Sequence, residues 1–371
     1  MKFSQLKFNL VFLIVYFFCF TSVHAISDVQ GYENVQTKEL DANEFLENII
    51  QHVNERRSFK GLLPLEKDEI VVSTASEQAR NLIIKGYLSY YNSNQQGPDE
   101  RYTLLGGSGA LTEIVKGFEI DKKDDRKIKL TDLLARQLIE AISLNPDDSQ
   151  ILYSPYVTHI GSGFALSKDK NKFAVVIDFV TKSGNLQPLK PVLNWGEKLS
   201  VSGKIPPPFK FKAVSVAYFD QSKMSDVTFN NNEEESNDYY FDDENIKPYF
   251  PPQDFIAYSD TSKSNFVKII KGLGVVGAIA GAPFTGGATA ILAPAILNSI
   301  QNGPPREIPL KKGIKANSKG EFFGQIDLNY KGMGGLYFVS VLGELPGVDY
   351  PVVISRRTVR VNHPLQPQGE S

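Results

Sequence analysis

Only one cysteine occurs in this chain of 371 residues, and its position restricts how the rest can fold. Cys19 lies near the end of an unbroken apolar run, residues 10–20, which follows the basic residues Lys2 and Lys7. The small residue Ala25 then provides a site for signal peptidase. Because the apolar run is shorter than the ~20 residues that span a bilayer, a cleaved signal peptide is favoured over a membrane anchor.

Removal of residues 1–25 leaves a chain without cysteine, so the mature protein must be stabilised by packing, without disulfides. We expect it to be secreted or extracellular, or to lie in a periplasm or at a cell surface. The chain exceeds the ~100–200 residues usual for one domain, which predicts two. Hydrophobic residues at 42% and charged residues at 22% are typical of globular proteins. The net charge of −2 argues against a nucleic-acid partner, which would require a basic surface.

The first half of the mature chain, residues 26–183, is predicted to have an α/β fold. Apolar residues at helical spacing predict three helices, which begin after Asp41, near Glu69 and after Thr131. The segment 172–180 is apolar on both of its alternating faces, as expected of a strand that is covered on both sides. Helices combined with a covered strand predict an α-β-α sandwich.

Two stretches of this half contain helix-breaking or polar residues and are predicted to be irregular. Residues 92–109 are polar and contain glycines, and we expect Gly106 to Gly109 to form a flexible loop. This glycine run lacks the lysine of a phosphate-binding loop. Residues 145–148 (Asn-Pro-Asp-Asp) are expected to end the third helix.

The second half, residues 184–371, is predicted to be an immunoglobulin-like antiparallel β-sandwich. Its short runs are rich in β-branched and aromatic residues and are bounded by turn residues. These runs are 199–202, 211–218, 322–328, 336–342 and 352–361. The segment 221–312 does not follow this strand rhythm and is predicted to be a long insert.

The insert has an acidic part, residues 230–245, and an apolar glycine-rich part, residues 272–300. The acidic part contains seven acids and no base, which predicts a solvated loop. A calcium site is the alternative, but the glycine and ligand spacing of an EF-hand are absent. The apolar part is interrupted by a Pro-Phe-Thr-Gly-Gly stretch, which predicts a hairpin of two short arms. Such a hairpin either inserts into a membrane or self-associates, or it is buried and caps the sandwich.

Six motifs occur in the first half in a characteristic order. They are Asn54 to Arg57 with Gly61 and Leu63 to Leu65, Ala75 and Ala79 before Gly86 to Ser89, Thr112 to Ile114, Ile151-Leu152, Tyr156 to Gly163, and Phe173 to Phe179. Together they resemble the CAP superfamily (SCP/PR-1-like) in its cysteine-free bacterial type, over residues 45–182. The resemblance implies an α-β-α sandwich. It also implies sterol or lipid binding or protein interaction, and only rarely hydrolysis.

The cleft of that family is built around two histidines and one or two glutamates, a set that suits divalent metals. Here Tyr90 stands where the first histidine is expected, and the second falls at or near Asp148. Only Glu113 stands where the family has a glutamate. We therefore expect neither a histidine-based metal site nor a cofactor. Tyr90, Glu113 and Asp148 are the predicted binding residues of a cleft that has become less ionic and more apolar.

Two sets of side chains in this half offer catalytic arrangements. A Ser-His-Asp set of Ser154, His159 and Asp148 lacks a nucleophile-elbow motif, so His159 is interpreted as a structural donor in a strand. Glu113 paired with Asp148 or Glu140 is an alternative for acid/base chemistry on a glycan.

The function that we expect is that of a secreted CAP/SCP-domain protein that binds an extracellular or cell-surface partner without catalysis. Its ligand is an unknown lipid, glycan or protein. One alternative is a hydrolase that acts on cell-wall or extracellular substrates through Glu113. Another is a membrane-active protein that makes peripheral membrane contact through residues 272–300.

Overall fold

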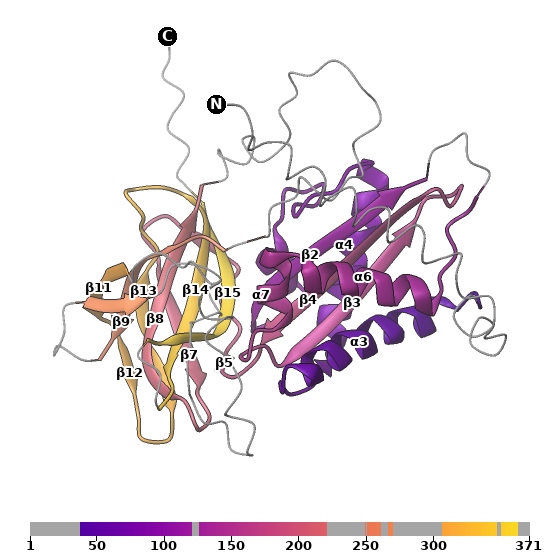
Figure 1. The fold of residues 1–371 in the computed structure, drawn as a ribbon. Coiled ribbons are helices and arrows are strands. Elements are labelled where there is room, and N and C mark those ends of the chain that lie inside the picture. Colours follow the sequence, from indigo (N-terminus) through magenta and orange to yellow (C-terminus); the bar gives the residue numbers. More distant parts are fainter. Residues whose placement is uncertain are drawn as a thin grey trace, which may run out of the picture.

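The computed structural model describes residues 38–120, 126–220, 249, 251–260, 266–269, 306–346 and 350–362. The expected signal peptide, acidic loop and apolar hairpin lie outside the described residues, so these predictions are not tested. The described part is a mixed α/β structure with an α/β unit (residues 38–182) beside a β unit (residues 183–362), as Figure 1 shows. Among the described helices, none is long and apolar enough to cross a membrane.

The α/β unit is built on a four-stranded sheet of order β1-β3-β4-β2. Its strands are β1 (Glu66–Lys67), β2 (Ala110–Glu119), β3 (His159–Leu166) and β4 (Lys172–Thr181). Strand β1 runs parallel to β3, and the other neighbours are antiparallel. Helices α3 (Ala42–Phe59) and α6 (Asp132–Leu144) pack on one face, and α4 (Glu69–Lys85) packs on the other. The prediction that β4 is covered on both sides is confirmed.

Each of the three predicted helices is confirmed, together with the residues that begin or end it. Asp41 accepts hydrogen bonds from the backbone N–H groups of Asn43 and Glu44 at the start of α3. Thr131 caps α6 in the same way through Leu134. Gly86 ends α4 in the left-handed conformation with φ 78°, which glycine adopts without strain. Local sequence signals thus set the helix ends correctly.

Two glycines of β3 allow α4 to pack directly on the strand backbone. A Cβ atom at Gly161 would collide with the backbone of Val71 and Val72, and one at Gly163 with the backbone of Ser76. Only glycine removes that obstacle. Because α4 lies so close to the sheet, the apolar residues Val176 and Ala79 fall in one core cluster.

The two segments of the α/β unit that were predicted to be irregular each contain a helix that the sequence did not predict. Helix α5 (Pro98–Leu104) lies within the stretch 92–109 that was expected to be a loop, and Pro98 occupies its first turn, where proline is tolerated. Helix α7 (Pro146–Leu152) begins directly after α6, with Asn145 as its N-cap. The Asn-Pro pair therefore ends one helix and starts the next.

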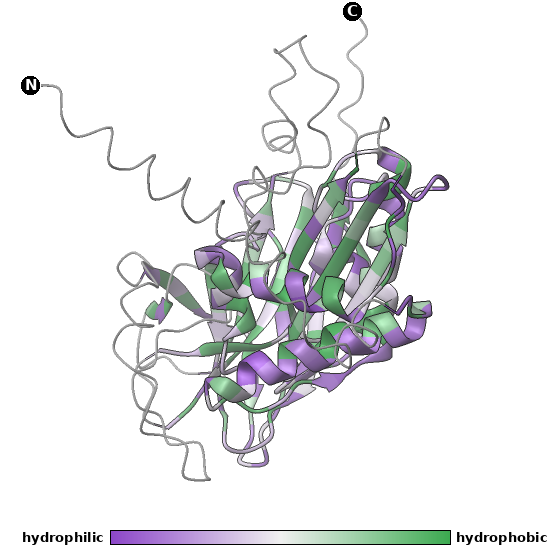
Figure 2. Ribbon diagram, turned by 45° about the vertical axis from the view of Figure 1, so that its right-hand side comes forward, coloured by the Kyte–Doolittle hydropathy of each residue, from purple (hydrophilic) through white to green (hydrophobic). Residues whose placement is uncertain are grey.

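The β unit consists of two sheets that face each other. The larger has the order β10-β11-β9-β8-β14-β15-β6 and the smaller the order β12-β13-β7-β5. Phe211 of β8 stacks on Phe322 of β13, with ring centroids 5.2 Å apart, which joins the two sheets in one core. Figure 2 shows the hydrophobic residues concentrated on the strands and the hydrophilic ones on outward-facing helix surfaces. The bounds are β5 (Asn185–Leu186), β6 (Val192–Asn194), β7 (Lys198–Lys204), β8 (Lys210–Phe219), β9 (Asp254–Ser259), β10 (Phe266–Ile269), β11 (Arg306–Lys312), β12 (Ile314–Ala316), β13 (Glu321–Asp327), β14 (Gly335–Glu344) and β15 (Val352–Asn362).

The five predicted runs become β7, β8, β13, β14 and β15, but two features of the β unit differ from expectation. The segment 221–312, predicted as an insert, supplies three strands, β9, β10 and β11, to the larger sheet. The sandwich is also not wholly antiparallel, because β11 pairs with β9 and β15 with β6 in parallel. Parallel strands that pair in a sheet require long connections between them. The local spacing of strands and turns in the sequence therefore does not predict such pairs.

Candidate functional site

The three predicted binding residues lie near one another, although they come from the loop after α4, from β2 and from α7. Burial, followed by the charges of Glu113 and Asp148, raises the pKa of Tyr90 well above its usual value. All three residues are buried, with exposed fractions of 8% for Tyr90, 0% for Glu113 and 4% for Asp148. The fold thus brings these side chains together but does not present them to solvent.

Glu113 belongs to a group of charged side chains that we call the buried acid cluster, made of Glu113, Asp178 and Arg101. Glu113 on β2 and Asp178 on β4 lie directly opposite each other in the antiparallel ladder. Arg101 reaches them from α5 and donates a hydrogen bond from Nη2 to Oε2 of Glu113. The side chains of Arg101 and Glu113 are 1% and 0% exposed.

Burial and mutual repulsion determine the charge of this cluster. Burial and then the negative charge of Glu113 raise the pKa of Asp178 well above its usual value. Burial also raises the pKa of Glu113, but the charge of Arg101 and its hydrogen bond oppose that rise. Two neighbouring carboxylates with one cation cannot both remain ionised in a buried site. Glu113 and Arg101 form an ion pair, and Asp178 is the carboxyl whose ionisation this site disfavours more.

Asp148 is engaged by a lysine from the same strand that carries Glu113. Oδ2 of Asp148 lies 2.8 Å from Nζ of Lys116, and the two side chains are 6% and 11% exposed. Asp148 sits in the first turn of α7, and Asn145 accepts a hydrogen bond from its backbone N–H. Its carboxylate is therefore held against β2.

The position beside Tyr90 is filled by another part of the chain, Tyr249. The two tyrosine rings lie 5.8 Å apart between centroids. The Tyr249 hydroxyl donates a 2.9 Å hydrogen bond to Oδ2 of Asp99 on α5, and both residues are buried. Nη1 of Arg356 on β15 lies 3.4 Å from Oδ1 of Asp99. Residues of the β unit thus close the region where the cleft was expected.

Helix α5 joins the two units through its remaining charges. Arg360 of β15 donates to both carboxylate oxygens of Glu100, at 2.6 and 3.0 Å. Arg357 donates to the carbonyl of Gly107 at 2.7 Å. A Cβ atom at Gly107 would collide with the ring of Tyr102, so the loop packs tightly against α5.

These contacts correct the expectation that Gly106 to Gly109 is flexible, because the loop is fixed from both units. The sequence reading also missed Arg101, Asp99 and Asp178 as members of the site. The one available signal was the pair Arg356-Arg357 inside a predicted strand, since buried arginines require partners.

In the part of the chain that the structure describes, no group of three or more histidine, cysteine, aspartate or glutamate side chains is placed to hold a metal ion. Glu113 is instead occupied by Arg101. The site is therefore built as a set of fixed ion pairs.

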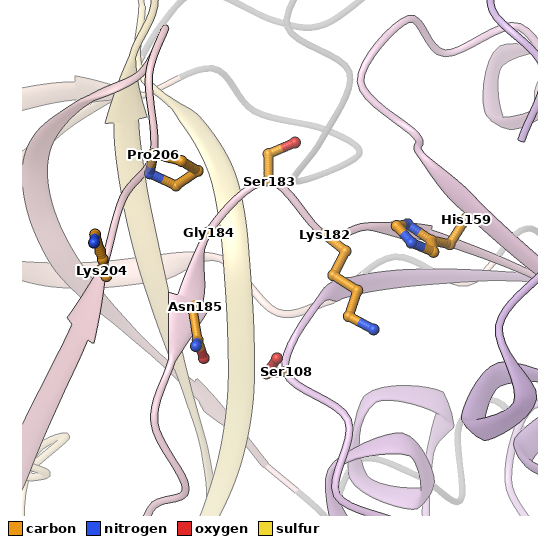
Figure 3. Close-up of a pocket in the computed structure, with 8 residues that line it drawn as sticks. All are labelled: Ser108, His159, Lys182, Ser183, Gly184, Asn185, Lys204 and Pro206. Atoms are coloured by element: carbon orange, nitrogen blue, oxygen red, sulfur yellow. The ribbon is translucent and has the colours of Figure 1, made fainter. Parts of the chain in front are cut away.

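An open pocket of about 520 Å³ lies elsewhere, where the two units meet, and we call it the junction pocket. Figure 3 shows Ser108, His159 and Lys182 on the side of the α/β unit and Asn185, Lys204 and Pro206 on the side of the β unit. Ser183 and Gly184 lie between them, and their backbone N–H groups donate to the carbonyl of Ile354 at 3.2 and 2.9 Å. The pocket wall is thus tied to β15.

Comparison with known proteins gives limited similarity. No family model and no curated protein matches the chain. An outer surface protein from Borrelia burgdorferi is similar over 38% of this chain and 96% of its own length, with 18% identity and a TM-score of 0.32. An extracellular protein containing a SCP domain from Bacillus anthracis str. Ames is similar over 42% of this chain and 45% of its own, with 15% identity and a TM-score of 0.30. Both similarities cover less than half of this chain.

Proposed function

We propose that this chain is a secreted, non-enzymatic binding protein of the extracellular space or cell surface. In this proposal a CAP-like α/β unit and an immunoglobulin-like β unit form one scaffold, and the ligand is a lipid, glycan or protein. The observation that supports a non-enzymatic function is the burial and pairing of Glu113, which is fully buried and already paired with Arg101.

Catalysis through Glu113 would require its carboxyl to reach a substrate. A general acid or base must come within hydrogen-bond distance of the proton that it transfers. Here Arg101 occupies one oxygen of Glu113, and Asp178 lies opposite it on the next strand. Tyr249 and α5 would also have to move away before a ligand touched Tyr90. These contacts support a structural role for the three cleft residues and weigh against the hydrolase alternative.

The test compares the purified mature protein with Glu113→Gln on a panel of ester, glycan and peptidoglycan substrates. We expect no turnover that depends on Glu113. Gln keeps the volume of Glu, and Asp178 still offers Arg101 an acidic neighbour once the repulsion from Glu113 is removed, so we expect the variant to fold. Substrate turnover by the parent that is lost in a folded Glu113→Gln variant would refute the non-enzymatic proposal.

A further inference from the structure

The junction pocket combines an open shape with an unusual set of charges. Its volume falls in the range of small-molecule sites, about 300–1,000 Å³. Every ionisable side chain that lines it is basic, namely Lys182, Lys204 and His159. The chain as a whole carries a net charge of −2, so a basic lining here is a local property of the pocket.

Lys204 presents its charge to the pocket from the β unit. It lies at the end of β7, its side chain is exposed, and the structure gives it no ion-pair partner among the residues described. Its backbone pairs with Asn185, which lines the same pocket. The strand therefore fixes the backbone position of Lys204, while its ammonium group stays available for a ligand.

Lys182 lines the pocket from the α/β unit and has one acidic neighbour. Its Nζ donates to Oδ2 of Asp68 at 2.8 Å, and the lysine side chain is 39% exposed while that of Asp68 is 8% exposed. The other oxygen of Asp68 accepts the backbone N–H groups of Ile70 and Val71 at the start of α4. An ammonium group has three donors, so Lys182 retains N–H groups for a ligand.

The hydrogen bonds around His159 indicate which ring nitrogen is left for the pocket. Thr158 Oγ1 donates to the carbonyl of Val180 at 3.2 Å and accepts the backbone N–H of Lys182 at 3.0 Å. Nδ1 of His159 also lies 2.7 Å from this hydroxyl oxygen, so Thr158 engages that ring nitrogen. Nε2 is then the outer nitrogen, and it lies 3.7 Å from Glu66, whose side chain is 83% exposed.

We propose that the junction pocket binds the oxyanion group of a small acidic ligand, a sulfate, phosphate or carboxylate, between Lys182, Lys204 and Nε2 of His159. Ser108 and Asn185 supply hydroxyl and amide groups for the polar remainder of the ligand, and Pro206 supplies an apolar wall. The site needs both units, because its two lysines come from different ones. This inference gives the proposed binding function a place and a ligand class, and it rests on that function.

The pKa of His159 provides a direct readout of anion binding in the pocket. Burial, followed by the charge of Lys182, lowers the pKa of His159 from its usual value. A bound anion favours the protonated ring, so its arrival raises that pKa. A merely structural role for the pocket residues would leave the pKa of His159 unchanged when anions are added.

The experiment uses the mature protein with three probes: a sulfated disaccharide, its desulfated counterpart and sodium sulfate, all at constant ionic strength. Affinity is measured by calorimetry, and the His159 ring is followed by NMR between about pH 5 and 8, where histidine titrates. The signal is assigned with His159→Gln. We expect the sulfated disaccharide to bind and to raise the pKa of His159.

Matched lysine variants localise the site. Lys204→Gln is expected to weaken binding about tenfold, as for one lost charge-assisted hydrogen bond. Lys198→Gln removes the same charge at the other end of β7 and should leave the affinity unchanged. Binding of sodium sulfate as tight as that of the disaccharide would identify a free anion as the ligand, and weaker binding would identify an acidic glycan.

Three results would overturn the proposal. The first is binding of the desulfated disaccharide with the same affinity as the sulfated one. The second is a pKa of His159 that changes neither with the sulfated disaccharide nor with sodium sulfate. The third is an equal loss of affinity in Lys204→Gln and Lys198→Gln. None of them bears on Glu113, so failure of this site is distinguishable from failure of the non-enzymatic proposal, which the Glu113→Gln assay tests.

Discussion

The buried acid cluster and the junction pocket are both assembled from ionisable side chains, yet they are opposite kinds of environment. In the cluster, Arg101 and Glu113 are 1% and 0% exposed and each is the other's partner. In the pocket, Lys204 is exposed and Lys182 is 39% exposed. The positions that the family resemblance marks for binding are thus closed, and the open site takes only His159 from the motifs of that resemblance.

This difference follows from the cost of removing charge from water. A buried charge must be paired, and such a pair is difficult to separate for the sake of a ligand. A charge at the surface keeps its hydration and exchanges it readily for a partner. Charged residues therefore hold the structure together at the first site and remain available at the second. Three substitutions test that contrast.

Arg101→Met should have the largest effect. It removes the cation paired with Glu113 and leaves two buried carboxyl groups, so we expect a loss of about 3–5 kcal/mol in the free energy of unfolding. The measurement is urea denaturation at neutral pH. Arg80→Met is the control, because Arg80 is exposed on α4 and its loss should change stability by less than about 0.5 kcal/mol.

A second variant separates charge from packing in this experiment. Adding Glu113→Gln to Arg101→Met removes the unpaired carboxylate and should recover a substantial part of the lost stability. A loss with Arg101→Met no greater than that with Arg80→Met would show that the cluster does not depend on buried charge.

Asp178→Asn should have a smaller effect that depends on pH. Because burial and Glu113 raise the folded-state pKa of Asp178, its stabilising contribution is complete below the unfolded pKa of about 3.9 and is lost as the pH rises. Asparagine resembles the protonated acid and does not titrate. The variant should therefore gain stability relative to the parent as pH rises from about 4, by at most about 1.4 kcal/mol per pH unit. Denaturation curves across that range measure the slope, and a slope of opposite sign would mean that Asp178 is ionised in the folded protein.

Lys182→Gln should have the smallest effect and the opposite pH direction. It removes the ion pair with Asp68. Because the Lys182 side chain is 39% exposed, we expect a loss of about 0.5 kcal/mol in the free energy of unfolding at neutral pH. Burial alone would raise the pKa of Asp68, but the hydrogen bonds from Lys182 and from the backbone lower it. The contribution is therefore present above the unfolded pKa and is lost as the pH falls through the folded one. Parent and variant should converge in acid, and a difference that persists there would assign the lysine a role independent of Asp68.

Much of the α/β unit was predictable because its signals are local. Asp41, Thr131 and Gly86 mark helix ends through bonds to residues within four positions of themselves. The apolar residues on both alternating faces of β4 indicate that both faces of the strand are covered. Helix α5 was not predicted because it is short and because its charged residues are typical of a solvated loop. They are buried because α5 packs against β2, β15 and α4.

The candidate site was predictable only in part. Tyr90, Glu113 and Asp148 were selected by motif position, and the structure places them near one another. Their partners were not predictable, since Arg356 and Asp99 are separated by 257 positions in the chain and the ladder places Asp178 opposite Glu113. The junction pocket likewise takes residues from both units.

The sequence by itself determined that Cys19 is the only cysteine, so that no disulfide forms within the chain, and it determined the three capped helices, the covered strand and five strands of the β unit. These depend on periodicity and on contacts between near neighbours. Only the tertiary structure decided that the predicted cleft is filled by Tyr249 and α5 and that an open basic pocket lies between the units. Burial and the pairing of distant charges are properties of the packed chain, and they decide whether a charged residue serves as a structural partner or stays available to contact a ligand.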